Sequence, residues 1–270
     1  MAYNLLKGKR GIIFGALDES SIAWKAAQKI KEEGGIFTLT NAPIAMRLGE
    51  INKLAQECNA QIIPADATSV EDLEKLIQQS VEVLGGELDF ILHSIGMSPN
   101  VRKGKEYGDL NYEWYLKTLD VSGLSFHKVM QVAEKQDAMN EYGSILALTY
   151  IAAQRTFPDY SDMAQAKAVL ESIARSYGYR YAKKKKVRVN TISQSPTWTK
   201  AGSGVPGFDI FFDYADKMSP LGNASAEDCA NYIVMMFSDL TRKVTMQNLM
   251  HDGGFSSSGI TEEIVAAIKK

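Results

Sequence analysis

The chain has 270 residues, a formal net charge of −2 at pH 7 and a pI near 6.0. The charge and pI argue against nucleic acid as its main partner, and the length suits one α/β domain with a large core. No stretch approaches about 18 apolar residues and the N-terminus lacks the apolar run of a signal peptide, so we expect no membrane span and a soluble cytoplasmic protein. Cys58 and Cys229 lie far apart without metal-site spacing, so we expect reduced thiols and no bound metal.

Short apolar runs alternate with longer amphipathic runs along the whole chain. We expect strands over residues 11–14, 36–40, 61–64, 88–93, 143–148, 187–192 and 247–251. Between them we expect helices over residues 21–31, 44–57, 70–84, 112–135, 160–182 and 226–238. This order predicts an α/β fold: a Rossmann-type, doubly wound parallel sheet of about seven strands in a single domain spanning 1–270. Ligands bind such sheets beyond the carboxyl ends of the strands, so the loops after the strands are the candidate functional segments.

The loop after the first predicted strand has features of a phosphate-binding turn. It lacks the usual G-x-G-x-x-G of dinucleotide folds, but Gly15 ends the strand and Ser21-Ile22-Ala23 opens the helix. Gly15 permits a tight turn, and Ser21 can offer its hydroxyl and N–H to a pyrophosphate at the helix N-terminus. A plain strand-to-helix turn capped by serine explains the same residues equally well.

The loops after the third and fourth predicted strands contain further candidates. Asp66, followed by Ala67, can accept from an adenine amino group or simply cap the next helix. The fourth strand ends in His93-Ser94-Ile95-Gly96, where Gly96 allows the backbone to pass close to a ligand. We interpret His93 itself as a core histidine.

Tyr160 and Lys167 form a candidate catalytic pair. Their spacing of seven residues is two helical turns, which predicts that both side chains project from one helix face. A nearby ammonium lowers the pKa of a phenol and strengthens it as a hydrogen-bond donor. The same spacing also arises by chance, so the pair gains meaning only from its context.

Taken together, these motifs resemble the divergent short-chain dehydrogenase/reductase family, and within it the NADH-dependent enoyl-acyl-carrier-protein reductases. The shared features occur in the family's order along essentially the whole chain: Gly15-x5-Ser21-x-Ala23, the string 93–96, Tyr160-x2-Met163-x3-Lys167, Val187-Arg188-Val189-Asn190 and Asp252-Gly253-Gly254. Each motif is weak alone, but five in register are a strong signal.

The resemblance implies a reaction of fatty-acid biosynthesis. A hydride from NADH would reach the β-carbon of a trans-2-enoyl thioester, and Tyr160 would donate to the thioester oxygen as negative charge develops there. Lys167 would hold the nicotinamide ribose hydroxyls. The family's second tyrosine, ten residues upstream, corresponds to Tyr150, which would gate substrate or assist protonation; an aromatic residue at a strand end is the simpler explanation of Tyr150.

The resemblance also implies contacts to the cofactor and substrate. Those to the cofactor are Gly15, Ser21 and Ile22 at the pyrophosphate, Asp66 and Ala67 beside the adenine, Ser94, Ile95 and Gly96 at the centre, and Thr197 and Thr199 facing the nicotinamide amide and phosphates. Ser98 would contact the substrate.

Two departures bear on the subclass. Carbonyl-reducing relatives carry a serine thirteen residues before the tyrosine, where this chain has Ala147, although Thr149 lies nearby. This difference favours an enoyl reductase over a β-ketoacyl reductase.

The second strand is followed by Asn41. Neither an acid for the adenosine ribose nor a basic pair for a 2′-phosphate is present there, and only Arg47 follows in the next helix. We expect NADH, with NADPH left open.

The stretch 196–220 is expected to be a mobile lid whose apolar face covers an acyl chain, or else a helix that packs on the core. Its only cations are Lys200 and Lys217, which weakens the case for docking an acidic carrier protein there.

The four lysines of 183–186 are expected to form a solvated turn. The family implies a homotetramer joined through the fourth and fifth predicted helices.

Two other functions remain compatible with the sequence. One is a short-chain carbonyl or ketoacyl reductase, which turnover of a ketone without enoyl turnover would establish. The other is a catalytically silent NAD(P)-binding sensor, against which the intact Tyr160–Lys167 pair argues.

Overall fold

The computed structural model describes residues 2–269, apart from the side chains of Leu48 and Asp159. All the paired strands run parallel in one seven-stranded sheet, in the order β3-β2-β1-β4-β5-β6-β7. The strands are β1 (Arg10–Phe14), β2 (Ile36–Thr40), β3 (Gln61–Ile62), β4 (Leu88–His93), β5 (Met139–Thr149), β6 (Arg188–Gln194) and β7 (Asn248–His251). The predicted doubly wound α/β fold is therefore confirmed, with the strand order reversing at β1 and β4.

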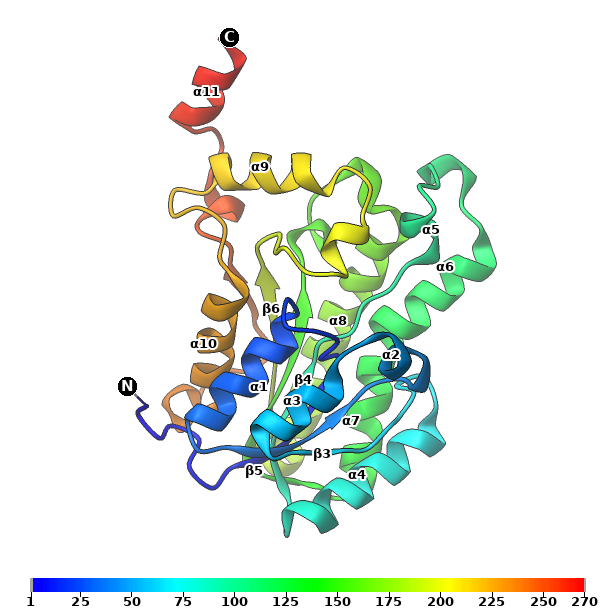
Figure 1. Cartoon of the computed structure of the whole chain (residues 1–270), viewed down its shortest axis with the longest axis vertical. Helices are drawn as coiled ribbons and strands as arrows, with labels where there is room; N and C mark the ends of the chain where they lie inside the picture. The colour runs from blue at the N-terminus through cyan, green and yellow to red at the C-terminus, as the bar shows by residue number, and fades with distance from the viewer. Residues whose placement is uncertain (1, 270) are drawn as a thin grey trace.

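Helices cover both faces of the sheet (Figure 1). One face is packed against α1 (Ile22–Glu32), α3 (Ile51–Cys58) and α10 (Ala226–Phe237). The other is packed against α4 (Val70–Leu84), α7 (Ser125–Lys135) and α8 (Ser161–Lys185). The remaining α-helices are α2 (Pro43–Leu48), α5 (Pro99–Arg102), α6 (Tyr112–Leu119), α9 (Phe208–Met218) and α11 (Glu262–Ile268).

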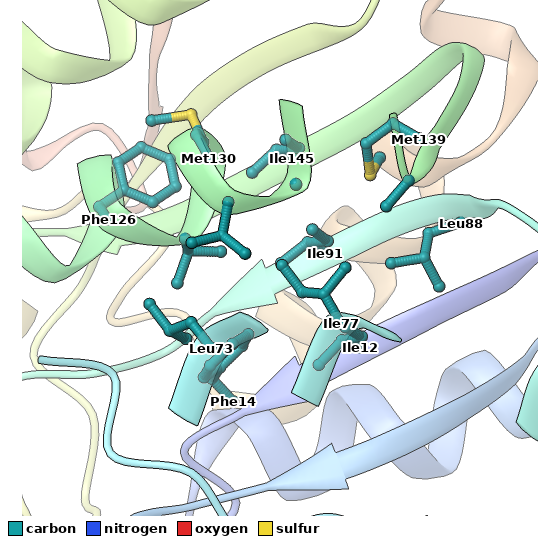
Figure 2. Packing of buried hydrophobic residues seen from close by; sticks show 14 of the residues in the cluster. Ile12, Phe14, Leu73, Ile77, Leu88, Ile91, Phe126, Met130, Met139 and Ile145 are labelled. Carbon is teal, nitrogen blue, oxygen red and sulfur yellow. The ribbon is translucent and has the colours of Figure 1, made fainter. Parts of the chain in front are cut away.

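Two apolar cores follow from the alternation of side chains along the strands. In β1, Ile12 and Phe14 point into the α4/α7/α8 core, whereas Ile13 points into the α1/α3/α10 core. Figure 2 shows the first of these, where strand residues meet Leu73 of α4 and Phe126 of α7. Since both faces are buried, the strands read as nearly continuous apolar runs.

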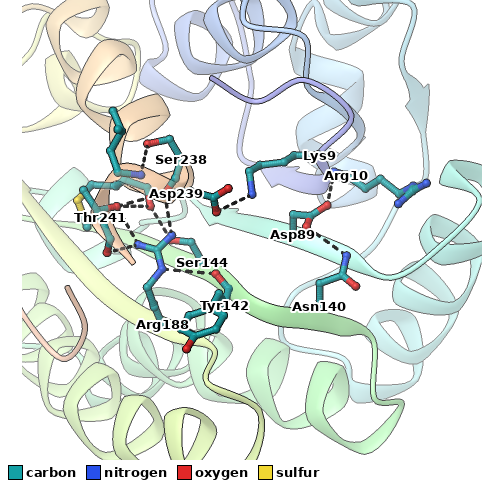
Figure 3. A network of polar contacts seen from close by, with 12 residues as sticks. Lys9, Arg10, Asp89, Asn140, Tyr142, Ser144, Arg188, Ser238, Asp239 and Thr241 are labelled. Carbon is teal, nitrogen blue, oxygen red and sulfur yellow. Dashed lines mark hydrogen bonds and ion pairs between the residues drawn. The ribbon is translucent and has the colours of Figure 1, made fainter. Parts of the chain in front are cut away.

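The amino ends of the strands are joined by a polar network (Figure 3). The Arg188 side chain is 2% exposed and donates to the carbonyls of Ser238 and Thr241 and to the Thr241 hydroxyl. Burial lowers the pKa of Arg188 to about 10. Nearby, Asp89 accepts from the Arg10 N–H and the Asn140 amide. This network fastens the end of α10 to the sheet and leaves the carboxyl ends of the strands for the site.

Two predicted helices are interrupted in the structure. The expected helix over 44–57 is divided into α2 and α3, because the Glu50 N–H donates to the Leu17 carbonyl at 2.8 Å. A Cβ on Gly49 would lie 2.5 Å from the same carbonyl oxygen, so the chain must pass close to the first loop there. The expected helix over 112–135 contains a π-helical turn, η2 (Asp120–Leu124), between α6 and α7.

The other differences are small. Strand β5 begins four residues earlier than expected, at Met139, and β3 has only two residues. The lysines of 183–186 lie at the end of α8 and beyond, where Lys184, Lys185 and Lys186 pair with carboxylates. Among the described residues, no helix combines the length and apolar character needed to cross a membrane.

Candidate active site

Gly15 makes the closest contact between the first two loops of the site. Its φ is +91°, a conformation that side chains other than glycine rarely adopt. A Cβ at this position would lie 1.9 Å from the Ser94 carbonyl oxygen. The loops that follow β1 and β4 therefore touch through their backbones at the reversal point of the strand order, which is where α/β sheets bind ligands.

The loop after Gly15 is held by its own hydrogen bonds. The Ser21 hydroxyl donates to the Asp18 carbonyl at 2.7 Å and accepts from the Leu17 N–H at 3.3 Å. Ser21 stands at the N-cap of α1 without bonding the helix through its side chain. The serine cap that the sequence offered as one explanation is therefore absent, and α1 begins at Ile22 without that side-chain acceptor.

The π-helical turn η2 holds the loop after β4. The Ser122 hydroxyl donates to the Met97 carbonyl at 3.0 Å and accepts from its N–H at 2.9 Å. A Cβ on Gly123 would lie 3.0 Å from the Ala166 carbonyl oxygen, so this turn packs closely on α8. One turn later, Ser125 meets the fully buried His93 ring at 2.8 Å. Burial, followed by the Lys167 charge, lowers the pKa of His93 to about 3, as suits a neutral core histidine.

Lys167 lies at the centre of the site. Its side chain projects from α8, is 6% exposed and donates to the carbonyls of Leu148 at 2.9 Å and Ile95 at 3.1 Å. A Cβ on Gly96 would lie 3.6 Å from Nζ, so the string 94–96 passes directly beside the ammonium. An ammonium has three N–H donors, and these two carbonyls leave one for a ligand. Burial lowers the pKa of Lys167 to about 8, an effect that Glu171 opposes.

Tyr160 reaches the site differently from the prediction. It ends a 3₁₀ turn, η4 (Pro158–Tyr160), and α8 begins at the next residue, Ser161, with a φ of +43°. The prediction of one helix containing both Tyr160 and Lys167 is therefore wrong for Tyr160, which lies one residue before α8. Burial raises the pKa of Tyr160, so the phenol stays neutral and keeps an O–H that can donate a hydrogen bond.

An aromatic cluster surrounds this phenol. The Tyr150 ring lies 5.2 Å from the rings of both Tyr160 and Phe157. Phe157 in turn lies 6.0 Å from Phe211 on α9 and 6.3 Å from Phe255. The 196–220 segment therefore joins this aromatic cluster through Phe211, which packs against Phe157.

The base of the 196–220 segment contacts the first loop. Its Lys200 N–H donates to the Ser20 hydroxyl at 3.2 Å, and its Nζ lies 3.8 Å from an Asp18 carboxylate oxygen. The predicted cofactor residues of this segment bond locally. The Thr197 hydroxyl donates to the Ser195 carbonyl, and the Thr199 hydroxyl accepts from the Gly202 N–H.

Asp66 and Ala67 follow β3, close to the start of α4. Asp66 accepts from the Thr68 N–H at 2.9 Å and from its hydroxyl at 2.7 Å, so it forms a turn. The helix cap that the sequence offered for Asp66 is instead made by Ser69, which caps α4. Ala67 is buried. Within residues 2–269, no group of three or more His, Cys, Asp or Glu side chains is arranged to hold a metal ion.

Two buried carboxylates of the site were missed by the sequence analysis. Asp162 is fully buried and accepts from the Ser98 hydroxyl at 2.6 Å and from the Asn100 amide at 2.8 Å. Glu171 is 4% exposed and accepts from the Thr149 hydroxyl and the Gln154 amide, both at 2.9 Å. The four-residue spacing from Lys167 to Glu171 was a signal for the second; for Asp162 the sequence offers none.

Comparison with known proteins gives one consistent picture. A family described as "Enoyl-(Acyl carrier protein) reductase" matches residues 15–256. The chain is 32% identical over 261 residues to "Enoyl-[acyl-carrier-protein] reductase [NADH] 1" of Rhizobium meliloti, covering 96% of this chain and 94% of that protein. It is also 31% identical over 262 residues to the NADH enoyl-acyl-carrier-protein reductase FabI of Rickettsia typhi, covering 96% and 98% of the two chains.

Solved structures agree in both fold and sequence. The FabI–NADH complex from Alistipes finegoldii superposes with a TM-score of 0.96 at 63% identity, covering 97% of this chain and 92% of that one. The NADH enoyl-acyl-carrier-protein reductase of Aquifex aeolicus gives a TM-score of 0.87 at 30% identity, covering 95% and 99%.

Proposed function

The chain belongs to the enoyl-(acyl carrier protein) reductase family, and from this premise we propose that Tyr160 and Lys167 catalyse hydride transfer from NADH to the β-carbon of a trans-2-enoyl thioester. The protein is an NADH-dependent oxidoreductase of fatty-acid biosynthesis that acts on a CH–CH group. The observation that carries the proposal is the buried Lys167 ammonium, held by two carbonyls beside Gly96 with one donor left over.

The residues at the carboxyl ends of the strands suit a dinucleotide. The close backbone contact at Gly15 and the N-terminus of α1 at Ser21 and Ile22 would receive the pyrophosphate. Lys167 would hold the ribose hydroxyls next to Ser94, Ile95 and Gly96, with Asp66 and Ala67 on the adenine side and Thr197 and Thr199 on the nicotinamide side. When bound, NADH supplies the hydride.

Tyr160 would stabilise the charge that develops during the reaction. As the alkene accepts a hydride, negative charge moves to the thioester oxygen, and a neutral phenol is a donor suited to that oxygen. Because burial raises the pKa of Tyr160, the donor keeps its proton across the physiological range. Tyr150 would close the aromatic wall beside it and contact the substrate. Ser98 would contact the substrate through its main chain, since its hydroxyl donates to Asp162.

The surroundings of Tyr160 favour an alkene over a ketone. The position thirteen residues upstream, which carries a serine in carbonyl reductases that the chain resembles, is the buried Ala147. The nearest substitute, the Thr149 hydroxyl, is already donated to Glu171 at 2.9 Å. A second donor for a ketone oxygen is thus missing at these positions, whereas reduction beside a thioester depends on the tyrosine and lysine.

A carrier-protein thioester is the proposed substrate, but both cations of the 196–220 segment lie near carboxylates. Lys217 pairs with Asp213, and Lys200 lies near Asp18. The 196–220 segment, which we propose as a lid, therefore offers an acidic carrier little charge complementarity. We expect apolar lid residues to contribute more to carrier affinity than charge does.

We also propose a homotetramer. A groove of about 610 Å³ lies between α7 and α8, with lining residues that include His127, Val169, Ile173 and Tyr177. Leu116 and Leu124 extend the same helical stripe and are 67% and 44% exposed. A second copy would cover this stripe, and light scattering after gel filtration measures the number of subunits.

Both cysteines are free and buried, and we retain the cytoplasm as the proposed location.

The test of the function is loss of NADH absorbance in the presence of a medium-chain trans-2-enoyl thioester. We expect rapid loss with NADH, and a parallel reaction with NADPH measures cofactor selectivity. Carrier-protein and coenzyme A thioesters of the same acyl chain compare the two substrate forms. Turnover of a β-ketoacyl thioester without turnover of the enoyl thioester would instead establish a carbonyl reductase, and tight NADH binding without any turnover would establish a sensor.

A further inference from the structure

Glu171 lies one helical turn beyond Lys167, and both side chains are directed to the carboxyl end of β5. Lys167 donates to the carbonyl of Leu148, while Glu171 accepts from the hydroxyl of the next residue, Thr149. Both side chains are almost completely buried, at 6% and 4% exposure. The neighbouring positions on helix and strand therefore bring a buried cation and a buried carboxylate to the same end of the sheet.

The carboxylate of Glu171 is fixed in place without being neutralised. Each of its oxygens accepts one neutral hydrogen bond, from Thr149 to Oε1 and from Gln154 to Oε2. Neither donor carries a charge, so the full negative charge of Glu171 acts on its surroundings. A buried charge acts over a longer distance than an exposed one, because less water is present to screen it.

The other ionisable groups around Lys167 do not supply this charge. His93 of β4 is buried and neutral, and Tyr150 and Tyr160 keep their protons because burial raises the pKa of each. Asp162 also accepts only neutral hydrogen bonds, from Ser98 and Asn100 on the α5 side of α8, but of the two buried carboxylates it is Glu171 that raises the pKa of Lys167. Asp120 of η2 pairs with Lys128 at 2.6 Å.

We propose that Glu171 is a positioning residue whose buried carboxylate keeps Lys167 in the ammonium form that the cofactor site requires. This inference rests on the proposed function of Lys167 and adds a residue to it. A neutral amine would lose both its charge and one of its three donors. Burial acts against the ammonium and Glu171 acts for it, so the balance between the two sets the pH above which Lys167 no longer binds the ribose.

The experiment compares the wild type with Glu171→Gln, which removes the charge but preserves the shape. NADH affinity is measured by fluorescence titration from about pH 6 to about pH 10. In the same samples, the carbon-13 signal of the Lys167 side chain is followed, identified by its loss in Lys167→Arg. We expect the wild-type signal to titrate near pH 8. In Glu171→Gln, we expect the midpoint of the Lys167 titration to move down by about one pH unit. The pH at which NADH affinity is lost should move down by the same amount.

Two matched variants separate charge from packing. Glu171→Asp keeps the carboxylate and is expected to move the midpoint back towards that of the wild type. Thr149→Val removes one hydrogen bond to Glu171 but not its charge, so stability falls while the midpoint stays in place. An unchanged Lys167 midpoint in Glu171→Gln would overturn the proposal. Failure of the wild type to bind NADH would refute the cofactor site, and the carbon-13 titration would still decide the effect of Glu171.

Discussion

The rings of Tyr150 and Tyr160 meet edge to face, with their centroids 5.2 Å apart and an angle of 61° between their planes. Tyr150 follows β5, whereas Tyr160 ends the turn before α8, so the contact joins two segments that approach the site from different elements. Burial raises the pKa of both phenols, and the neighbouring Tyr160 raises the pKa of Tyr150 further. The pair therefore provides two neutral hydroxyl donors. Of the two residues, only Tyr160 lies immediately before α8.

We expect Tyr160→Phe to lower kcat by about 10²- to 10³-fold, because it removes a donor to an oxygen that gains charge in the transition state. The ring remains, so the contact with Tyr150 and the fold are preserved. NADH affinity should be unchanged, since the proposed ribose contact belongs to Lys167. Steady-state kinetics with an enoyl thioester and a fluorescence titration with NADH measure the two quantities.

Tyr150→Phe is the matched control, since it removes the other phenol hydroxyl of the same pair. We expect a smaller loss of kcat, together with a change in KM because Tyr150 is proposed to contact the substrate. Equal losses in the two variants would mean that the hydroxyls act as a unit, and an unaffected Tyr160→Phe enzyme would exclude Tyr160 as the donor.

Gly15→Ala should destabilise the fold by about 3 kcal/mol, from the positive φ and from the clash with the Ser94 carbonyl. Gly8→Ala is the control, because its φ is +75° and a Cβ there meets nothing within 4 Å. It should cost only about 1 kcal/mol. Urea unfolding measures both values. Equal costs would show that the loops after β1 and β4 can separate without penalty.

Acid should destabilise the protein partly through His93. Its folded-state pKa of about 3 lies below the ordinary 6.5. Between these values the unfolded chain binds a proton that the native state does not, so the free energy of unfolding decreases as the pH falls below about 6.5. His93→Gln removes this proton, and the variant should lose about 1.4 kcal/mol less per pH unit than the wild type in that range. Parallel pH slopes in urea unfolding would mean that His93 becomes protonated in the folded state.

The sheet was predictable because its strands are apolar runs bounded by turn residues. Strands β2 and β4 and helix α4 have the predicted bounds, and α4 has the serine cap and glycine stop that mark helix ends. The division at Gly49 was not predictable, since it depends on a backbone contact with Leu17, more than thirty residues away. The π-helical turn likewise follows from the packing of Gly123 on α8 rather than from local propensity.

Within the site, sequence motifs indicated Tyr160 and Lys167 but not what surrounds them. The helical spacing of this pair was correct for Lys167 and wrong for Tyr160, because the backbone at Ser161 breaks the helical geometry. Charged residues are mostly exposed, so the spacing of Glu171 from Lys167 indicates a shared helix face but not burial, and nothing in the chain alone indicates that Asp162 is buried. Their burial depends on hydrogen-bond donors from loops distant in sequence.

Ser98 and Asp162 provide a test of how the loop after β4 is attached to α8. The Ser98 hydroxyl donates to Asp162 at 2.6 Å and accepts from the Val101 N–H at 3.0 Å, so it both caps α5 and anchors it. We expect Ser98→Ala to lower stability by about 1–3 kcal/mol, because a buried carboxylate loses a donor. KM for the enoyl thioester should stay the same, since the proposed substrate contact is through the main chain.

Asn100→Ala removes the other donor to the same carboxylate, the amide at 2.8 Å, and serves as the matched variant. If both donors act on stability through Asp162, then each costs less in an Asp162→Ala background than in the wild type, because the carboxylate they satisfy is gone. Urea unfolding of the single and double variants measures this coupling. A rise in KM for Ser98→Ala without loss of stability would show instead that the hydroxyl leaves Asp162 to meet the substrate, and that the loop is held to α8 by Asn100 alone.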